Sequence, residues 1–138
     1  MTKEEVIELA KKIIAENKFA IVGTTNLMGY PNVRALKVMK NENYEVFYFS
    51  TRANSYKIKQ MKRKPKGCIY FYNTEKFESV MMEGNFKVEE NRNFEISDIY
   101  KIDYDDPFDF AVIKFFPKTI YVYTHFQSVK LDVKDFQK

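Results

Sequence analysis

Short runs of β-branched and aromatic residues, separated by turn residues, are the feature that most limits the fold of this chain. The 13 Phe and 10 Tyr residues favour strands, because large side chains pack well on a pleated sheet. Most connections between the runs are short, which predicts antiparallel pairing and a small closed or half-closed barrel rather than a parallel α/β sheet. The expected strands are 19–25, 32–39, 44–50, 67–72, 78–88, 110–116 and 119–123.

Two helices are expected to flank these strands. Thr2 and Glu5 have the spacing of a capping box, and apolar residues then recur at intervals of three and four, which predicts a helix ending near Asn17. Ser55 is placed to cap a second helix, which reaches about Lys64 and is stopped by the following proline. The whole sequence is therefore predicted to be mainly β with flanking helices.

Several connections are predicted from their turn residues. Residues 41–43 are expected to form a turn, and the Pro117-Lys118 pair is expected to form the turn of a final hairpin. Gly84 is expected to mark a β-bulge in its strand. A third, short helix is predicted between residues 92 and 100, followed by an acidic loop at 103–109.

The length of 138 residues suits one domain, and residues 1–138 are expected to form it. The formal charge of +4 is modest, and the N-terminus begins with acidic residues where a secretory signal would be basic. No apolar stretch approaches the roughly 20 residues that span a bilayer. We therefore expect a cytoplasmic protein that does not enter a membrane.

The single cysteine, Cys68, excludes an internal disulfide and is expected to be a small buried hydrophobe.

No familiar catalytic motif is present, so the catalytic residues stay unassigned. The sequence has no glycine-rich dinucleotide loop, no phosphate-binding Gly-Lys motif, and no His or Cys pair with metal-ligand spacing. The single histidine, His125, is expected to be solvated in a tail after the last strand. The composition therefore favours binding over side-chain catalysis, and no metal site is predicted.

One segment, residues 50–57, indicates an anion site. Hydroxyl groups, the N–H groups of a helix start and the Lys57 cation would converge there, and Arg34 could approach from a neighbouring strand. Structural interpretations remain open for each residue. Ser55 can be a simple helix cap, Lys57 a solvated lysine, and Arg34 a member of a surface ion pair.

In the order and spacing of its motifs, the chain resembles the pyridoxamine 5′-phosphate oxidase-like family of FMN-binding split barrels, and most closely its general stress protein branch. The resemblance covers about residues 5–90. It is carried by AIVGTT at 20–25, GYPNVRAL at 29–36, VFYFST at 46–51, Ser-Tyr-Lys at 55–57 and Lys-Pro at 64–65.

The resemblance implies a split barrel of six to seven strands with two or three helices, and a homodimer with FMN sites at the subunit interface. In this family the arginine of the second strand and the Ser-x-Lys motif hold the FMN phosphate, while the second-strand backbone lies along the flavin ring. Ser79 is expected to approach the partner's flavin. The implied cofactor-binding residues are Arg34, Ala35, Leu36, Ser50, Thr51, Ser55, Lys57 and Ser79.

The sequence departs from the true pyridoxamine phosphate oxidases. It has no Trp and lacks their C-terminal substrate-binding pattern, and Tyr56 stands where many relatives have a basic residue. The resemblance therefore implies an FMN-dependent oxidoreductase acting on an unknown small molecule, or alternatively a non-catalytic flavin-binding or stress-related module. Some members use heme or a deazaflavin. A nucleic-acid contact by the lysine-rich segment 55–66 is a further alternative, but a solvated face explains that segment better, and no nucleic-acid partner is expected.

Overall fold

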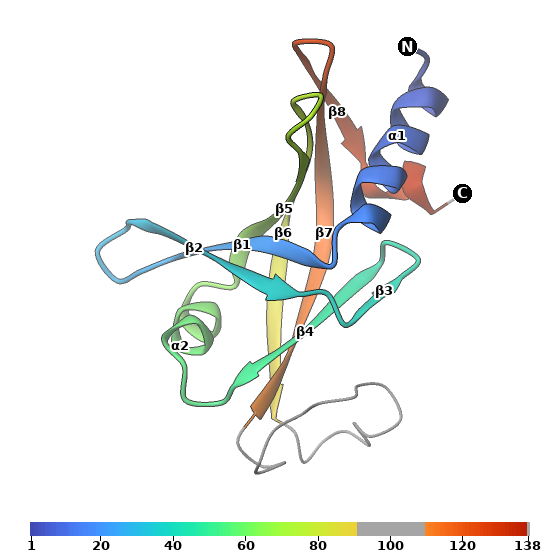
Figure 1. Cartoon of the computed structure of the whole chain (residues 1–138). Helices are drawn as coiled ribbons and strands as arrows, with labels where there is room; N and C mark the ends of the chain where they lie inside the picture. The colour runs from blue at the N-terminus through green and yellow to red at the C-terminus, as the bar shows by residue number, and fades with distance from the viewer. Residues whose placement is uncertain (91–109, 138) are drawn as a thin grey trace.

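The computed structural model describes residues 1–90 and 110–137. The predicted third helix and the acidic loop at 103–109 lie outside the described residues. The elements that the structure describes are shown in Figure 1. They are α1 (Lys3–Glu16), β1 (Phe19–Thr25), β2 (Pro31–Lys37), β3 (Lys40–Glu42), β4 (Val46–Arg52), α2 (Tyr56–Arg63), β5 (Lys66–Asn73), β6 (Glu78–Glu90), β7 (Phe110–Thr124), β8 (Gln127–Asp132) and the 3-10 helix η3 (Val133–Phe136).

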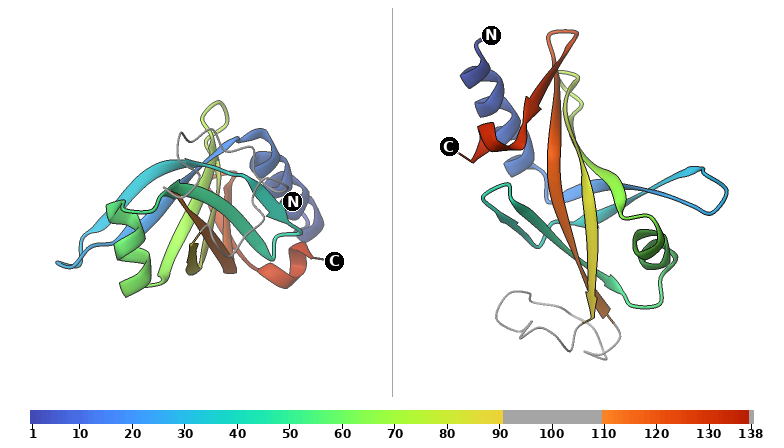
Figure 2. Two further views of the ribbon diagram at one scale, coloured as in Figure 1. Left: turned by 90° about the horizontal axis from the view of Figure 1, so that it is seen from below. Right: turned by 180° about the vertical axis from the view of Figure 1, so that it is seen from behind.

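The strands form one antiparallel sheet that curls into a half-barrel. Its order is β2-β1-β5-β6-β7-β4-β3, and β8 pairs with β7 beyond this path. Strand β7 is long enough to pair with β6 along one edge and with both β4 and β8 along the other. Strands β2 and β4 are also in contact, and Figure 2 shows the resulting curvature. The predicted fold class, a mainly β antiparallel split barrel, is confirmed.

The prediction of a hairpin around Pro117-Lys118 is wrong, because β7 runs continuously through these residues. Glu83 pairs with Thr119 and Gly84 pairs with Pro117, so Lys118 is an extra residue in a β-bulge. A bulge interrupts the ladder locally and so accommodates a proline, which has no N–H to donate. The expected irregularity at Gly84 is confirmed.

Two short strands, β3 and β8, were not predicted. The β3–β4 turn lies at Asn43 and Tyr44, and the β7–β8 turn at His125 and Phe126, all with positive φ values between 49° and 61°. Positive φ usually requires Gly, Asn or Asp, so three of these four residues give little sign of a tight turn. Residues 41–42 therefore belong to a strand, and His125 lies in a hairpin turn rather than in a tail.

The core fills the half-barrel with aromatic side chains. Phe47, Phe49, Phe71 and Phe115 are fully buried. Helix α1 packs against β5 and β6 with the apolar side chains expected from its periodicity, and the predicted Thr2–Glu5 capping box is confirmed. None of the helices in residues 1–90 and 110–137 is long and apolar enough to cross a membrane.

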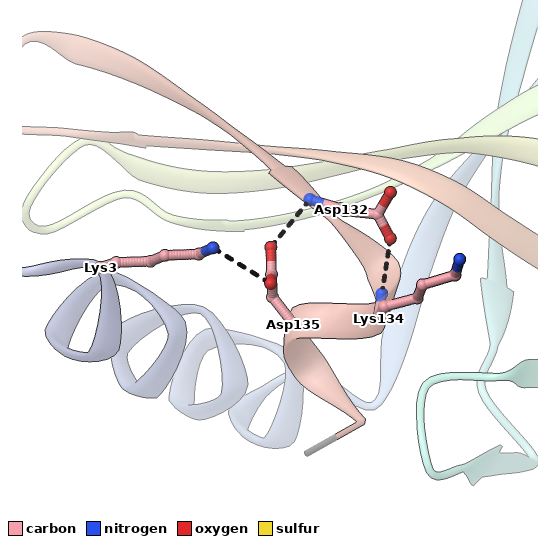
Figure 3. Close-up of polar contacts among 4 residues, drawn as sticks. All are labelled: Lys3, Asp132, Lys134 and Asp135. Carbon is pink, nitrogen blue, oxygen red and sulfur yellow. Dashed lines mark hydrogen bonds and ion pairs between the residues drawn. The ribbon is translucent and has the colours of Figure 1, made fainter.

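The C-terminal helix η3 ties the end of the described chain to α1. Asp132 accepts a hydrogen bond from the Lys134 N–H at 2.8 Å, and Asp135 accepts one from the Asp132 N–H at 3.2 Å. Asp135 also lies 3.1 Å from the Lys3 ammonium (Figure 3). The buried Phe136 ring packs edge-on against Tyr44, with ring centroids 5.5 Å apart. Helix α2 lies at the opposite end of the half-barrel (Figure 1).

Candidate functional site

Helix α2 packs against β1 and β6 and follows directly from β4. It buries Ile58, Gln60 and Met61, while its lysines other than Lys57 are exposed. The first turn of α2 contains no acidic residue. The partial positive charge of the helix start is therefore not offset from within that turn.

Arg34 reaches from β2 across β1 to α2. Its Nη1 donates hydrogen bonds to the Val22 carbonyl oxygen at 3.1 Å and to Thr24 Oγ1 at 2.7 Å. Its Nη2 donates to Gln60 Oε1 at 3.1 Å. All three acceptors are neutral, and burial lowers the pKa of the guanidinium. Within the described residues Arg34 has no ion pair, contrary to the alternative in which it neutralises a surface carboxylate.

Lys57 lies close enough to Arg34 for the two positive charges to interact. Its Nζ donates a hydrogen bond to the buried Thr51 Oγ1 at 3.0 Å. Burial lowers the pKa of Lys57, and the positive charge of Arg34 lowers it further. The ion pairs within the described residues involve other side chains. Two partly buried cations therefore share a region that no described carboxylate neutralises.

Ser55 occupies the N-cap position of α2, as predicted, but its hydroxyl makes no capping hydrogen bond. Within the described part of the chain, Ser55 Oγ is the one buried side-chain polar atom without a hydrogen-bond partner. Leaving a buried hydroxyl unpaired costs about 1–3 kcal/mol. An oxygen-rich anion at the start of α2 would satisfy it.

The other predicted residues are not gathered at this site. Ala35 is exposed and Leu36 is a core residue, although both adjoin Arg34 in β2. Ser50 alternates with Thr51 along β4 and so points to the opposite face of the sheet. Ser79 lies on β6, which β1 and β5 separate from β2. Of the predicted residues, the structure thus brings together Arg34, Thr51, Ser55 and Lys57.

The sequence reasoning missed Thr24, Asn32 and Gln60, which surround Arg34. Thr24 and Asn32 pair across β1 and β2, and both are polar at positions that face the inside of the half-barrel. Gln60 is a buried polar residue on the otherwise apolar face of α2. The sequence did carry a signal for these three residues. Each is polar at a position where the strand or helix periodicity predicts a core residue.

Neither His125 nor Cys68 contributes to this group. Thr124 Oγ1 lies 2.9 Å from His125 Nδ1 and donates a hydrogen bond to Glu78 Oε2 at 2.9 Å, at the tip of the β7–β8 hairpin. Cys68 is half-buried rather than fully buried, and burial raises the pKa of its thiol. No cluster of His, Cys, Asp and Glu suited to a metal ion occurs among residues 1–90 and 110–137.

The fold is an antiparallel split barrel, and two partly buried cations lie with the Thr51 and Ser55 hydroxyl groups beside α2. Residues 6–124 match the family model described as pyridoxamine 5′-phosphate oxidase. The chain belongs to this family. No curated protein matches the sequence.

Solved structures show the same fold. A Clostridium acetobutylicum protein related to general stress protein 26 has a TM-score of 0.80 at 24% identity, with 99% of each chain covered. An FMN-binding protein of Nostoc punctiforme has a TM-score of 0.62 at 13% identity, covering 94% of this chain and 93% of that one. A heme-binding protein of Mycobacterium smegmatis has a TM-score of 0.75 at 13% identity, covering 99% of this chain and 62% of that one.

Proposed function

We propose that this protein binds FMN and holds its phosphate between Arg34, Lys57, Thr51 and Ser55. The observation that carries the proposal is the pair of partly buried cations beside the unpaired Ser55 hydroxyl. A phosphate dianion would offset both positive charges and accept a hydrogen bond from Ser55. Such charge-assisted bonds are about twice as strong as bonds between neutral groups. The donor set therefore fits a phosphate.

When bound, FMN supplies hydride and electron transfer, and we propose an oxidoreductase that uses it on an unidentified small molecule. The protein residues would bind and orient the cofactor, and we propose that the β2 backbone at Ala35 and Leu36 would contact its ring. FMN is favoured over heme because the one histidine of the sequence lies in the β7–β8 turn, away from the site. The lack of Trp argues against pyridoxamine phosphate as the substrate.

The proposal is tested by incubating the purified full-length protein with FMN, removing unbound ligand on a desalting column and recording the visible spectrum. Flavin bands that elute with the protein in a near-stoichiometric amount are expected. Elution without flavin would refute the proposal. Retention of a deazaflavin, but not of FMN, in a parallel incubation would identify the deazaflavin as the cofactor.

If FMN is retained, a second experiment separates an oxidoreductase from a non-catalytic flavin-binding module. It measures whether the loaded protein slowly oxidises NADH or NADPH, compared with FMN alone.

We also propose that a second copy of the chain covers the outer face of the sheet. Ile21, Tyr70, Met81 and Tyr121 face each other in register across β1, β5, β6 and β7, and none is fully buried. This uncharged row is defined here as the outer apolar row. A contiguous apolar row that stays accessible on a sheet face is typical of an interaction site. In such a homodimer Ser79 would approach the partner's flavin.

Replacing Met81 with lysine, in the centre of the outer apolar row, is expected to convert the dimer to a monomer. A buried and unpaired ammonium would cost several kcal/mol at an interface. Sedimentation velocity measures the change, and Leu27→Lys, at an exposed apolar residue of the β1–β2 loop, is the matched control. A wild-type protein that sediments as a monomer at micromolar concentration would rule out the proposed interface.

The lowered pKa of Lys57 predicts how FMN affinity depends on pH. A bound phosphate dianion would raise this pKa back toward its ordinary value, so binding takes up a proton in the alkaline window between the two pKa values. FMN affinity should be constant from about pH 7, where the phosphate is already a dianion, up to that window and fall by up to about tenfold per pH unit within it. Calorimetric titrations from pH 8 upward check this. Riboflavin has the same ring without the phosphate and controls for ionisation of the flavin itself, so an equal loss for both ligands would contradict the prediction.

A further inference from the structure

Gln60 is the one buried polar side chain of α2. It is only 4% exposed. Its Oε1 accepts hydrogen bonds from Arg34 Nη2 and from Thr24 Oγ1, and its Nε2 donates to Asn32 Oδ1 at 2.8 Å. One amide group thus connects α2 to both β1 and β2. Resting on the proposed function, we infer that Gln60 is a positioning residue, which fixes the Arg34 guanidinium for the phosphate of FMN.

The helical spacing places Gln60 beside the other cation of the site. Lys57 and Gln60 are three residues apart in α2, so their side chains lie on the same face of the helix. Lys57 interacts with Arg34 through its charge, and Gln60 interacts with it through a hydrogen bond. The same helix face therefore brings Lys57 to the anion site and anchors Arg34 there.

The bonds to Arg34 leave part of its guanidinium available. A guanidinium has five N–H donors. Three are used by Val22, Thr24 and Gln60, and the other two have no partner among the described residues. Two donors are enough for a bidentate contact with a phosphate. The anchored arginine can therefore bind the ligand without giving up its present partners.

An amide at position 60 holds Arg34 without neutralising it. A carboxylate there could accept the same hydrogen bonds from Arg34 and Thr24, but it would pair with the guanidinium charge and repel a phosphate. An apolar side chain would leave Arg34 without one anchor, the Thr24 hydroxyl without its acceptor and Asn32 Oδ1 without its donor. The two substitutions therefore reduce phosphate binding for different reasons, which makes the inference testable.

The experiment measures the dissociation constants of FMN and riboflavin by calorimetry for the full-length wild type, Gln60→Glu, Gln60→Leu and the control Lys59→Gln. Lys59 is an exposed residue of the same helix. The ratio of the two constants isolates the contribution of the phosphate. We expect Gln60→Glu to lose about 30-fold or more in FMN affinity and Gln60→Leu about tenfold, as is typical for one charge-assisted bond. Riboflavin affinity, and both affinities of Lys59→Gln, should stay within about twofold.

The outcomes separate failure of this inference from failure of the proposed function. A wild type that binds riboflavin as tightly as FMN would refute the phosphate site itself. A wild type that prefers FMN, with Gln60 variants that keep this preference or lose both ligands equally, would show that Gln60 has only a structural role. If Gln60→Leu does not fold, as judged by circular dichroism, Gln60→Glu decides, because it retains the bonds to Arg34 and Thr24.

Discussion

Replacing Gly84 with alanine is expected to lower the free energy of unfolding by about 3 kcal/mol, the upper part of the range for overpacked sites. A Cβ at this position would lie 2.1 Å from the Phe116 carbonyl oxygen and 2.9 Å from the buried Phe115 ring. The first contact is with backbone in the paired strand β7, which cannot rotate away as a side chain can. The β6–β7 ladder must therefore shift at the bulge, in the centre of the sheet. Urea unfolding followed by circular dichroism measures the loss.

Gly29→Ala is the matched control for this prediction. Gly29 has a φ of +87°, but a Cβ there would meet nothing within 4 Å. Its cost comes from backbone strain alone and should be about 1–2 kcal/mol. A Gly84→Ala variant that is no less stable than Gly29→Ala would show that β6 and β7 do not approach as closely as the bulge requires.

Replacing Arg34 and Lys57 together with alanine is expected to weaken FMN binding by about 1,000-fold or more, equivalent to roughly 4 kcal/mol. Both substitutions remove charge-assisted donors from one partly buried site, where water screens charges less than it does at the surface. Riboflavin affinity should change by less than about threefold, because the ring contacts remain. Fluorescence titration of both flavins measures these affinities.

The double variant Lys59→Ala and Lys62→Ala is the control for net charge. It also removes two positive charges from this part of the molecule, but both residues are exposed on α2. Its FMN affinity should fall by no more than about threefold at physiological salt, where exposed charges are screened. Equal losses in the two double variants would mean that a diffuse positive field, and not the Arg34 and Lys57 site, attracts FMN.

The strands and helices of the first half of the chain were largely predictable from local patterns. The spacing of apolar residues and the Thr2–Glu5 box gave α1, and the strand 19–25 is observed with the predicted bounds. Errors arose where tertiary structure overrides local preference. Pro117 normally indicates a turn, but here the sheet continues through a bulge opposite Gly84. His125 and Phe126 adopt a tight turn that their residue types do not favour.

The candidate site was predictable in its charged residues and not in its supporting residues. Arg34, Ser55 and Lys57 could be proposed because cations and a helix start have recognisable chemistry. Gln60 and Asn32 could be noticed only as polar residues at expected core positions, and their role could not be proposed, because an amide acts through neighbours that the fold supplies. The sequence also cannot show that the Ser55 hydroxyl is buried without a partner, since this depends on how β4 enters α2. This unpaired hydroxyl is the observation that most strengthens the anion site.

The most direct test is the position of the FMN phosphate in a crystal structure of the protein with FMN. We predict phosphate oxygens about 2.7–3.0 Å from Lys57 Nζ, Ser55 Oγ and an Arg34 nitrogen, the distances of charge-assisted and hydroxyl hydrogen bonds. Arg34 should still donate to Gln60. FMN bound with its phosphate in solvent, or at another surface with Ser55 Oγ still unpaired, would contradict the account.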